Sequence, residues 1–265
     1  MSIKFWSFLQ DGLVKCYNGP HDTGKGIFMV QKIAGYMRKA IAEYQMLEPG
    51  DRLALGISGG KDSLAMLAGL CRLREYLDIP FDMEAFTLDP GFSGEQTDYS
   101  PIEALCREWG VPYTVRRTGI GEIIFDVRKE QNPCSLCARM RRGALHDLCK
   151  EHGCNKLALG HNWDDAVETF VMNLFQEGRI GCFSPVTYLS RKDLTVIRPL
   201  IYAPEKEILG AVRKEGLPIV KSKCPVDKTT NRQQTKDWLA EMDQKDHGFS
   251  KRLFGAMKRA HVDGW

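Results

Sequence analysis

The chain has 265 residues, 43% of them hydrophobic, which is enough to bury the core of one large domain or two modest ones. Its formal net charge of +3 is too small to attract nucleic acid through the field of the whole protein, so an RNA-binding surface must be a local patch. The chain has nine cysteines, an odd number, which excludes a complete disulfide framework. Because no secretory hydrophobic segment is present, these cysteines favour a reducing cytoplasmic compartment. No apolar run approaches the ~18 residues of a membrane span.

The N-terminal residues 1–28 are predicted to be an extension that precedes a main domain at 29–228. Gly19–Lys25 is close to a Walker A phosphate loop, but it lacks the Ser or Thr that must follow the lysine, and no strand precedes it. We therefore interpret it as a flexible connection. A helix is expected over 29–46, where apolar residues recur on one stripe. Residues 229–265 are expected to form a C-terminal helical segment.

From residue 51 onward, patterns typical of strands and of helices alternate. Strands are expected at 51–57, 83–88, 113–116, 156–159, 195–197 and 217–220. Helices are expected at 64–73, 100–109, 137–152, 164–176 and 204–215. This alternation predicts an α/β fold, a parallel sheet with helices on both faces. Ligands of such sheets bind at the carboxyl ends of strands, where the Gly56–Ser63 loop, Asp89 and Gly160-His161 are all expected to lie.

The loop Gly56–Ser63 lies between an expected buried strand and an expected helix. A glycine turn at this place aims backbone N–H groups at the positive end of the helix dipole, where phosphate binds. Gly59 and Gly60 let the backbone approach an anion closely. The loop also carries side-chain donors: Ser58, Lys61 and Ser63. It is not a Walker A loop, because Asp62 follows the lysine, and an ordinary glycine turn is the alternative.

Cys134 and Cys137 have C-x-x-C spacing at an expected helix start, where the dipole lowers the pKa of a thiol. Cys224 is a third candidate ligand. Three interpretations compete: a redox dithiol, a zinc site completed by His146 or Cys149, and an iron–sulfur cluster held by three thiolates with one iron left without a protein ligand. Local spacing alone favours zinc.

The stretch Gly160–Asp165 follows an expected strand and opens an expected helix. Asp164 and Asp165 are acceptors suited to Mg²⁺ or to a ribose hydroxyl, although a helix N-terminus favours acidic residues in any case. His161 is either a general acid or a histidine of the loop. Trp163 is either a platform for an unstacked RNA base or a core residue.

Basic residues gather around the cysteines. The first group follows the C-x-x-C pair: Arg139, Arg141 and Arg142. The second surrounds Cys224: Lys221, Lys223, Lys228 and Arg232. If the cysteines meet in space, these charges surround one mouth, as an RNA backbone requires, and solvated helix faces are the alternative.

Four stretches occur together and in order: Ser58–Ser63, Pro133–Gly143, Leu159–Asp165 and Cys224. The first resembles the PP-loop of the N-type ATP pyrophosphatases, which split ATP into AMP and pyrophosphate. Together they resemble the tRNA 2-thiocytidine synthetase (TtcA) family, over about residues 30–240. The resemblance implies a PP-loop, adenine-nucleotide alpha-hydrolase-like Rossmann-type fold for the main domain. It also implies that ATP adenylates the C2 oxygen of an anticodon-loop cytidine in tRNA, which sulfur then replaces, and that a [4Fe–4S] cluster is held by Cys134, Cys137 and Cys224.

The same resemblance implies a site for ATP and Mg²⁺. The expected nucleotide-binding residues are Ser58, Gly59, Gly60, Lys61, Asp62, Ser63, Asp89, Gly160 and Asp165. The expected catalytic residues are Lys61, Asp62, Arg141, His161 and Asp165. The implied partners are tRNA and a sulfur donor, either sulfide or sulfur derived from a cysteine desulfurase, and relatives are commonly homodimers.

The chain departs from the family at His161-Asn162, where the anticodon-loop enzymes often have His-His. His-Asn also occurs in relatives that thiolate other tRNA positions, but these usually carry zinc knuckles at both ends, and this chain has no second C-x-x-C pair. The target nucleotide is therefore left open. Two alternatives remain: a PP-loop enzyme acting on another thio-nucleoside, or removing sulfur, and a zinc-stabilised RNA-binding protein without turnover.

Overall fold

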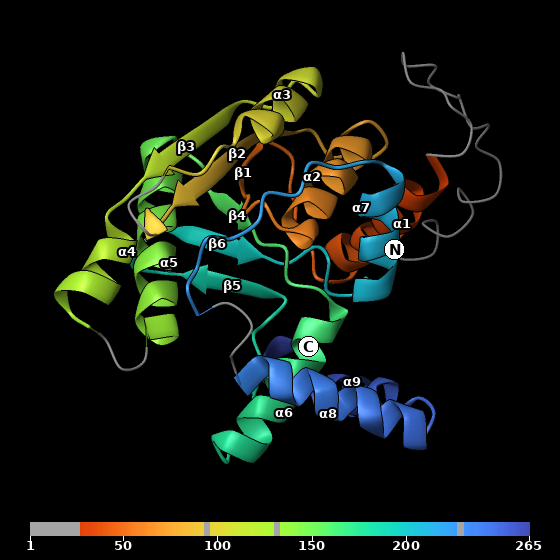
Figure 1. Ribbon diagram of the computed structural model, residues 1–265. Coiled ribbons are helices and arrows are strands. Elements are labelled where there is room, and N and C mark those ends of the chain that lie inside the picture. The colour runs from red at the N-terminus through yellow and green to blue at the C-terminus, as the bar shows by residue number, and fades with distance from the viewer. Residues whose placement is uncertain (1–26, 93–95, 130–132, 227–230) are drawn as a thin grey trace.

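A six-stranded sheet in the order β3-β2-β1-β4-β6-β5 lies at the centre of the protein in this computed structural model, which describes residues 27–92, 96–129, 133–226 and 231–265 (Figure 1). The strands are β1 (Asp51–Gly56), β2 (Phe81–Asp89), β3 (Tyr113–Arg117), β4 (Lys156–Ala158), β5 (Val186–Leu189) and β6 (Leu194–Ile197). All neighbours pair in parallel except β5, which is antiparallel to β6. The expected extension, as far as residue 26, and Lys228 lie outside the described residues.

Strand β5 is the one strand that the sequence pattern did not predict. It has four residues, none of them fully buried, and Tyr188 is 61% exposed, so no hydrophobic alternation marks it. A short turn joins it to β6, and Asp193 in that turn has a φ of 44°. A tight turn returns the chain antiparallel, because parallel neighbours need a long crossover. The sheet is therefore mostly parallel, as expected, with one antiparallel strand at this edge.

Helices cover both faces of the sheet, as the alternating pattern predicted. One face carries α1 (Ile27–Glu43), α2 (Lys61–Arg74), α3 (Ser100–Glu108) and α7 (Glu205–Lys214), and the other carries α5 (Pro133–Glu151). Strand β1 shows why both faces are covered. Leu53 and Leu55 join the core beneath α1 and α2, whereas Ala54 between them joins the core beneath α5. A central strand that is buried on both sides has a continuous apolar run.

Three further helices pack together at one end of the molecule (Figure 1). They are α6 (Trp163–Gln176), α8 (Asn231–Lys245) and α9 (Phe249–Arg259), and a small cluster around Val167, Val171 and Leu239 joins them. Helix α4 (Ile120–Glu122) runs into a π-helical turn (Ile123–Val127), and a 3-10 turn (Val262–Gly264) ends the chain. None of the helices in the described part of the chain is both long and apolar enough to cross a bilayer.

The segment 217–220, which the sequence pattern predicted to be a strand, is not one. Leu217 packs in the core, and the Val220 N–H donates a single backbone hydrogen bond to the Gly59 carbonyl at 3.0 Å. The apolar residues therefore mark a segment that crosses the loop between β1 and α2. This crossing carries the chain directly to Cys224.

Candidate functional site

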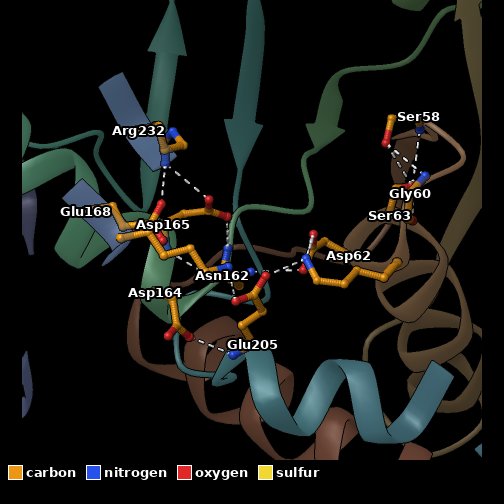
Figure 2. A network of polar contacts seen from close by, with 12 residues as sticks. Ser58, Gly60, Asp62, Ser63, Asn162, Asp164, Asp165, Glu168, Glu205 and Arg232 are labelled. Carbon is orange, nitrogen blue, oxygen red and sulfur yellow. Dashed lines mark hydrogen bonds and ion pairs between the residues drawn. The ribbon is translucent and has the colours of Figure 1, made fainter. Parts of the chain in front are cut away.

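The loop between β1 and α2 exposes the N-terminus of α2. Gly59 has a φ of +84°, in the left-handed region that favours glycine, and Gly60 caps the helix without a side-chain hydrogen bond. Two hydroxyls fix the shape of the loop (Figure 2). The Ser63 hydroxyl donates to the Gly60 carbonyl at 2.9 Å, and the Ser58 hydroxyl accepts from the Gly60 N–H at 3.3 Å. The arrangement leaves first-turn N–H groups available to an anion.

Lys61, the first residue of α2, lies between two carboxylates. Its Nζ is 2.7 Å from Asp62 Oδ2 and 2.9 Å from Glu205 Oε1 at the start of α7. Burial works against the charge on Lys61, but the two carboxylates outweigh burial and raise its pKa. Glu205 also forms an ion pair with Lys236 of α8. Lys61 is therefore a cationic group beside the open helix end, and Glu205, which sequence reasoning missed, holds it there.

The start of α6 abuts the start of α2. A Cβ on Gly160 would lie 3.1 Å from the Asp62 carbonyl carbon and 3.1 Å from the Ser63 nitrogen, so any larger residue would press on the start of α2. Asn162 caps α6: its Oδ1 accepts from the Asp165 N–H at 3.0 Å, and Asp165 Oδ2 accepts from the Asn162 N–H at 2.9 Å. Such a capping box stabilises the helix by about 1 kcal/mol. The N-termini of α2 and α6 thus lie next to each other.

The acidic residues of α6 already have partners within the protein (Figure 2). Asp165 Oδ1 accepts from Arg232 of α8 at 3.2 Å, and Arg232 also pairs with the buried Glu168 at 3.1 Å. Asp164 Oδ2 accepts from the Glu205 N–H at 2.6 Å, which satisfies the start of α7. Burial raises the pKa of Asp164, and it raises the pKa of Glu168 to about 7. Both aspartates therefore hold helix starts together, whatever they contribute to Mg²⁺.

Asp89 lies at the carboxyl end of β2 and His161 follows the carboxyl end of β4, and the two side chains have different surroundings. The His161 ring is 4.9 Å from the Phe183 ring, and its Nδ1 is buried without a hydrogen-bond partner among the described residues. Burial, with Arg198 and Arg232 nearby, lowers the pKa of His161 to about 3, so the ring is neutral and poorly suited to act as a general acid. The Asp89 carboxylate accepts hydrogen bonds from the Gly91 N–H at 3.1 Å and from the Thr97 N–H at 3.3 Å.

The three candidate thiols come together from two segments. Cys134 and Cys137 occupy the first turn of α5, and Cys224 follows the segment that crosses Gly59. Burial raises the pKa of the Cys137 thiol, Arg141 lowers it through its charge and a hydrogen bond, and the neighbouring Cys224 and Cys134 raise it. Cys137 is thus within electrostatic reach of both other thiols.

This donor set fits a cluster better than one ion. Within the described part of the chain, no three His, Cys, Asp or Glu side chains converge on a single metal position. A cubane cluster needs no such convergence, since each thiolate binds a different iron. Cys149, proposed as a fourth zinc ligand, is buried in the core beneath α5, where burial raises its pKa to about 12. Cys149 is therefore not available to complete a zinc site with Cys134 and Cys137.

The basic residues around the cysteines divide into two kinds. Arg139 and Arg142 are exposed on α5, one turn apart, whereas Arg141 is half-buried against Cys137. Lys221 is exposed, and the Lys223 ammonium donates to the Gln96 carbonyl at 3.3 Å. Arg232 is engaged in ion pairs with α6, so it is not part of the expected basic surface. Of the two alternatives for Trp163, the structure favours the core residue, because its ring packs 5.5 Å from Phe254 of α9.

Comparison with known proteins gives concordant matches. The PP-loop domain family matches residues 30–239. A tRNA-cytidine(32) 2-sulfurtransferase of Citrifermentans bemidjiense is 38% identical over 233 residues, covering 87% of this chain and 91% of the relative. Its counterpart in Geobacter metallireducens is 37% identical over 230 residues, covering 86% and 89%. The structure of the U34-tRNA thiolase NcsA from Methanococcus maripaludis, with its [4Fe-4S] cluster, matches at a TM-score of 0.73 and 27% identity, covering 88% of this chain and 78% of that one.

Proposed function

The chain belongs to the PP-loop domain family and, within it, to the tRNA-cytidine(32) 2-sulfurtransferase (TtcA) family, and we propose that it uses ATP to replace the C2 oxygen of cytidine 32 in tRNA with sulfur. The observation that carries this proposal is the crossing of Val220 over Gly59, because it brings the Cys224 segment against the open helix end that suits ATP phosphates. Activation of the base and delivery of sulfur therefore belong to one crevice.

The loop would carry out the activation. The α2 N-terminus and Ser58, Gly59, Gly60 and Ser63 would hold the phosphates, and Lys61 would exchange Glu205 for the leaving pyrophosphate. The C2 oxygen attacks the α-phosphorus, the bond to the β-phosphate bridging oxygen breaks, and pyrophosphate leaves. Asp62 would act through the Mg²⁺ that accompanies ATP, since Mg²⁺ is commonly bound by one or two carboxylates plus substrate phosphates. Asp89, Gly160, His161 and Asp165 would shape the walls of the site.

Sulfur delivery would take place at the cysteines. Cys134, Cys137 and Cys224 would hold the [4Fe–4S] cluster, which supplies, when bound, an iron without a protein ligand at which sulfur is delivered. Arg141 would balance the charge of the thiolates, because its guanidinium already contacts Cys137. The sulfur donor, sulfide or sulfur derived from a cysteine desulfurase, a homodimeric state and a cytoplasmic location are further parts of the proposal.

Product analysis tests the proposed function. We expect anaerobically prepared protein with ATP, Mg²⁺, sulfide and unmodified tRNA to form 2-thiocytidine, detected by mass spectrometry of the digested nucleosides. AMP and pyrophosphate should appear in equal amounts. A tRNA transcript with uridine at position 32 is the matched control and should stay unmodified. Formation of ADP and phosphate, or thiolation at another nucleotide, would contradict the proposal.

The exposed arginines of α5 give a prediction about tRNA binding. Replacing Arg139 and Arg142 together by alanine should weaken tRNA binding and reduce the slope of log K against log salt by about 0.7 for each phosphate that the arginines no longer neutralise. Arg141 is left in place because it contacts Cys137. Replacing Arg213 and Lys214, an exposed basic pair on α7, removes the same charge elsewhere and should change neither quantity. Binding is measured by filter retention across a salt series. An unchanged slope of log K against log salt in the Arg139 and Arg142 variant would show that this surface does not bind tRNA.

A further inference from the structure

Asn162 joins the two helix starts of the site through its side chain (Figure 2). Its Oδ1 accepts the Asp165 N–H at 3.0 Å and thereby caps α6. Its Nδ2 donates to Asp62 Oδ1 at 2.9 Å, across the junction between α6 and α2. Asn162 itself is only 3% exposed, and both hydrogen bonds are partly buried.

The cap alone does not account for an asparagine at this position. Asp and Ser cap helices about as well as Asn, because the cap needs only a side-chain oxygen acceptor. An amide differs in offering an acceptor and a donor from one planar group. The donor is directed at Asp62, whose other oxygen already contacts the Lys61 ammonium at 2.7 Å.

We propose that Asn162 is a positioning residue for adenylation, which fixes the Asp62 carboxylate so that it faces the ATP phosphates. The inference rests on the proposed function and deepens it. An Asp side chain has a broad, two-fold preference at its last torsion, so one contact does not define where both oxygens lie. With Nδ2 on Oδ1 and Lys61 on Oδ2, the carboxylate plane is fixed at two points. Without Nδ2, only the contact with Lys61 holds the carboxylate, which is then free to rotate about that contact.

The close approach at Gly160 makes this arrangement rigid. The backbone of Gly160 lies against the carbonyl of Asp62 and the nitrogen of Ser63, so closely that a Cβ on Gly160 would be 3.1 Å from each. The distance from the α6 cap to Asp62 is therefore set by backbone packing. The Asn162 side chain spans that fixed distance, so a group shorter than an amide does not reach Asp62.

Two substitutions separate positioning from capping. Asn162→Ser and Asn162→Asp both keep an oxygen that caps α6, and both lose the donor to Asp62. We expect the midpoint of thermal unfolding to stay close to wild type in Asn162→Ser, and to fall in Asn162→Asp because its carboxylate is repelled by that of Asp62. The kcat for pyrophosphate release, divided by the number of ATP-binding sites titrated in the same preparation, should fall about 100-fold in Asn162→Ser, the typical effect of a misplaced catalytic group. Asn162→Asp should lose at least as much, because it sets a second carboxylate against Asp62.

Val171→Ala is the matched control on the same helix. Val171 is buried between α6 and the C-terminal helices and packs with Val167 and Leu239, not with Asp62. Its truncation should therefore lower the unfolding midpoint and leave kcat per ATP-binding site unchanged. Wild-type protein assayed in parallel for AMP, pyrophosphate and 2-thiocytidine tests the proposed function separately.

The outcomes are distinguishable. The positioning role would be overturned if Asn162→Ser kept the wild-type kcat per ATP-binding site. It would also be overturned if the total rate of pyrophosphate release fell only in proportion to the number of ATP-binding sites lost. Failure of both Asn162 variants to fold would also overturn it, because it would show that the residue acts on structure. Wild-type protein that makes ADP would overturn the proposed function instead.

Discussion

Cys224→Ser protein, purified without oxygen, is expected to lack both the iron–sulfur cluster and tRNA thiolation. Wild-type protein should be brown and carry about four irons per chain. Cys224 is the one candidate ligand that comes from outside α5, so its loss leaves Cys134 and Cys137, too few protein ligands for a stable cubane. A serine hydroxyl is a hard ligand that stays protonated near neutral pH, and iron–sulfur clusters select soft thiolates.

Iron and sulfide are measured chemically on anaerobically reconstituted protein, and thiolation by nucleoside mass spectrometry. Cys149→Ala is the matched control, because Cys149 lies on the same helix as Cys134 and Cys137 but is fully buried in the core. It should keep both cluster and activity. Stoichiometric zinc without iron in the wild type, or full thiolation by Cys224→Ser, would refute the cluster assignment and favour the zinc-stabilised RNA-binding alternative.

Lys61→Ala should reduce pyrophosphate release by about 1,000-fold, since it removes the cation expected to stabilise the leaving phosphates. The fold should survive, because Glu205 keeps its ion pair with Lys236 when Lys61 is removed. Release of pyrophosphate is followed by a coupled assay with saturating tRNA, and folding by thermal unfolding.

A neighbouring ion pair supplies the control for this variant. Lys32 of α1 pairs with Glu207 of α7 at 2.7 Å, close to the pair between Lys61 and Glu205. Lys32→Ala removes a lysine that contacts the same helix start without touching the loop, and its turnover should equal that of wild type. Turnover in Lys61→Ala close to that of Lys32→Ala would mean that the phosphates bind elsewhere.

The loop between β1 and α2 was predictable from sequence because its determinants are local. A buried strand, a glycine turn and a helix follow one another within a few residues, and the structure has each of them in the expected place. The C-x-x-C pair at the start of α5 is local in the same sense. The coverage of both faces of the sheet follows from the alternation of strands and helices.

The contacts that complete the site were not predictable, because they join residues far apart in the chain. Glu205 reaches Lys61 only after α7 has packed beside α2, and Arg232 reaches Asp165 only through the packing of α8 on α6. The segment 217–220, which was wrongly predicted to be a strand, also depends on contacts with distant residues. Its apolar residues are those of a strand, but Leu217 packs in the core and Val220 lies against a glycine loop, partners that periodicity does not reveal.

The absence of a side chain at Gly59 lets the segment that leads to Cys224 pack against the loop between β1 and α2. A Cβ at this position would lie 3.0 Å from Val220 Cβ and 3.2 Å from its carbonyl oxygen, besides being strained at a φ of +84°. Any larger residue there would push away the segment that leads to Cys224 as well as reshaping the nucleotide loop. A substitution of Gly59 would therefore disturb the loop between β1 and α2 and the position of Cys224 at the same time.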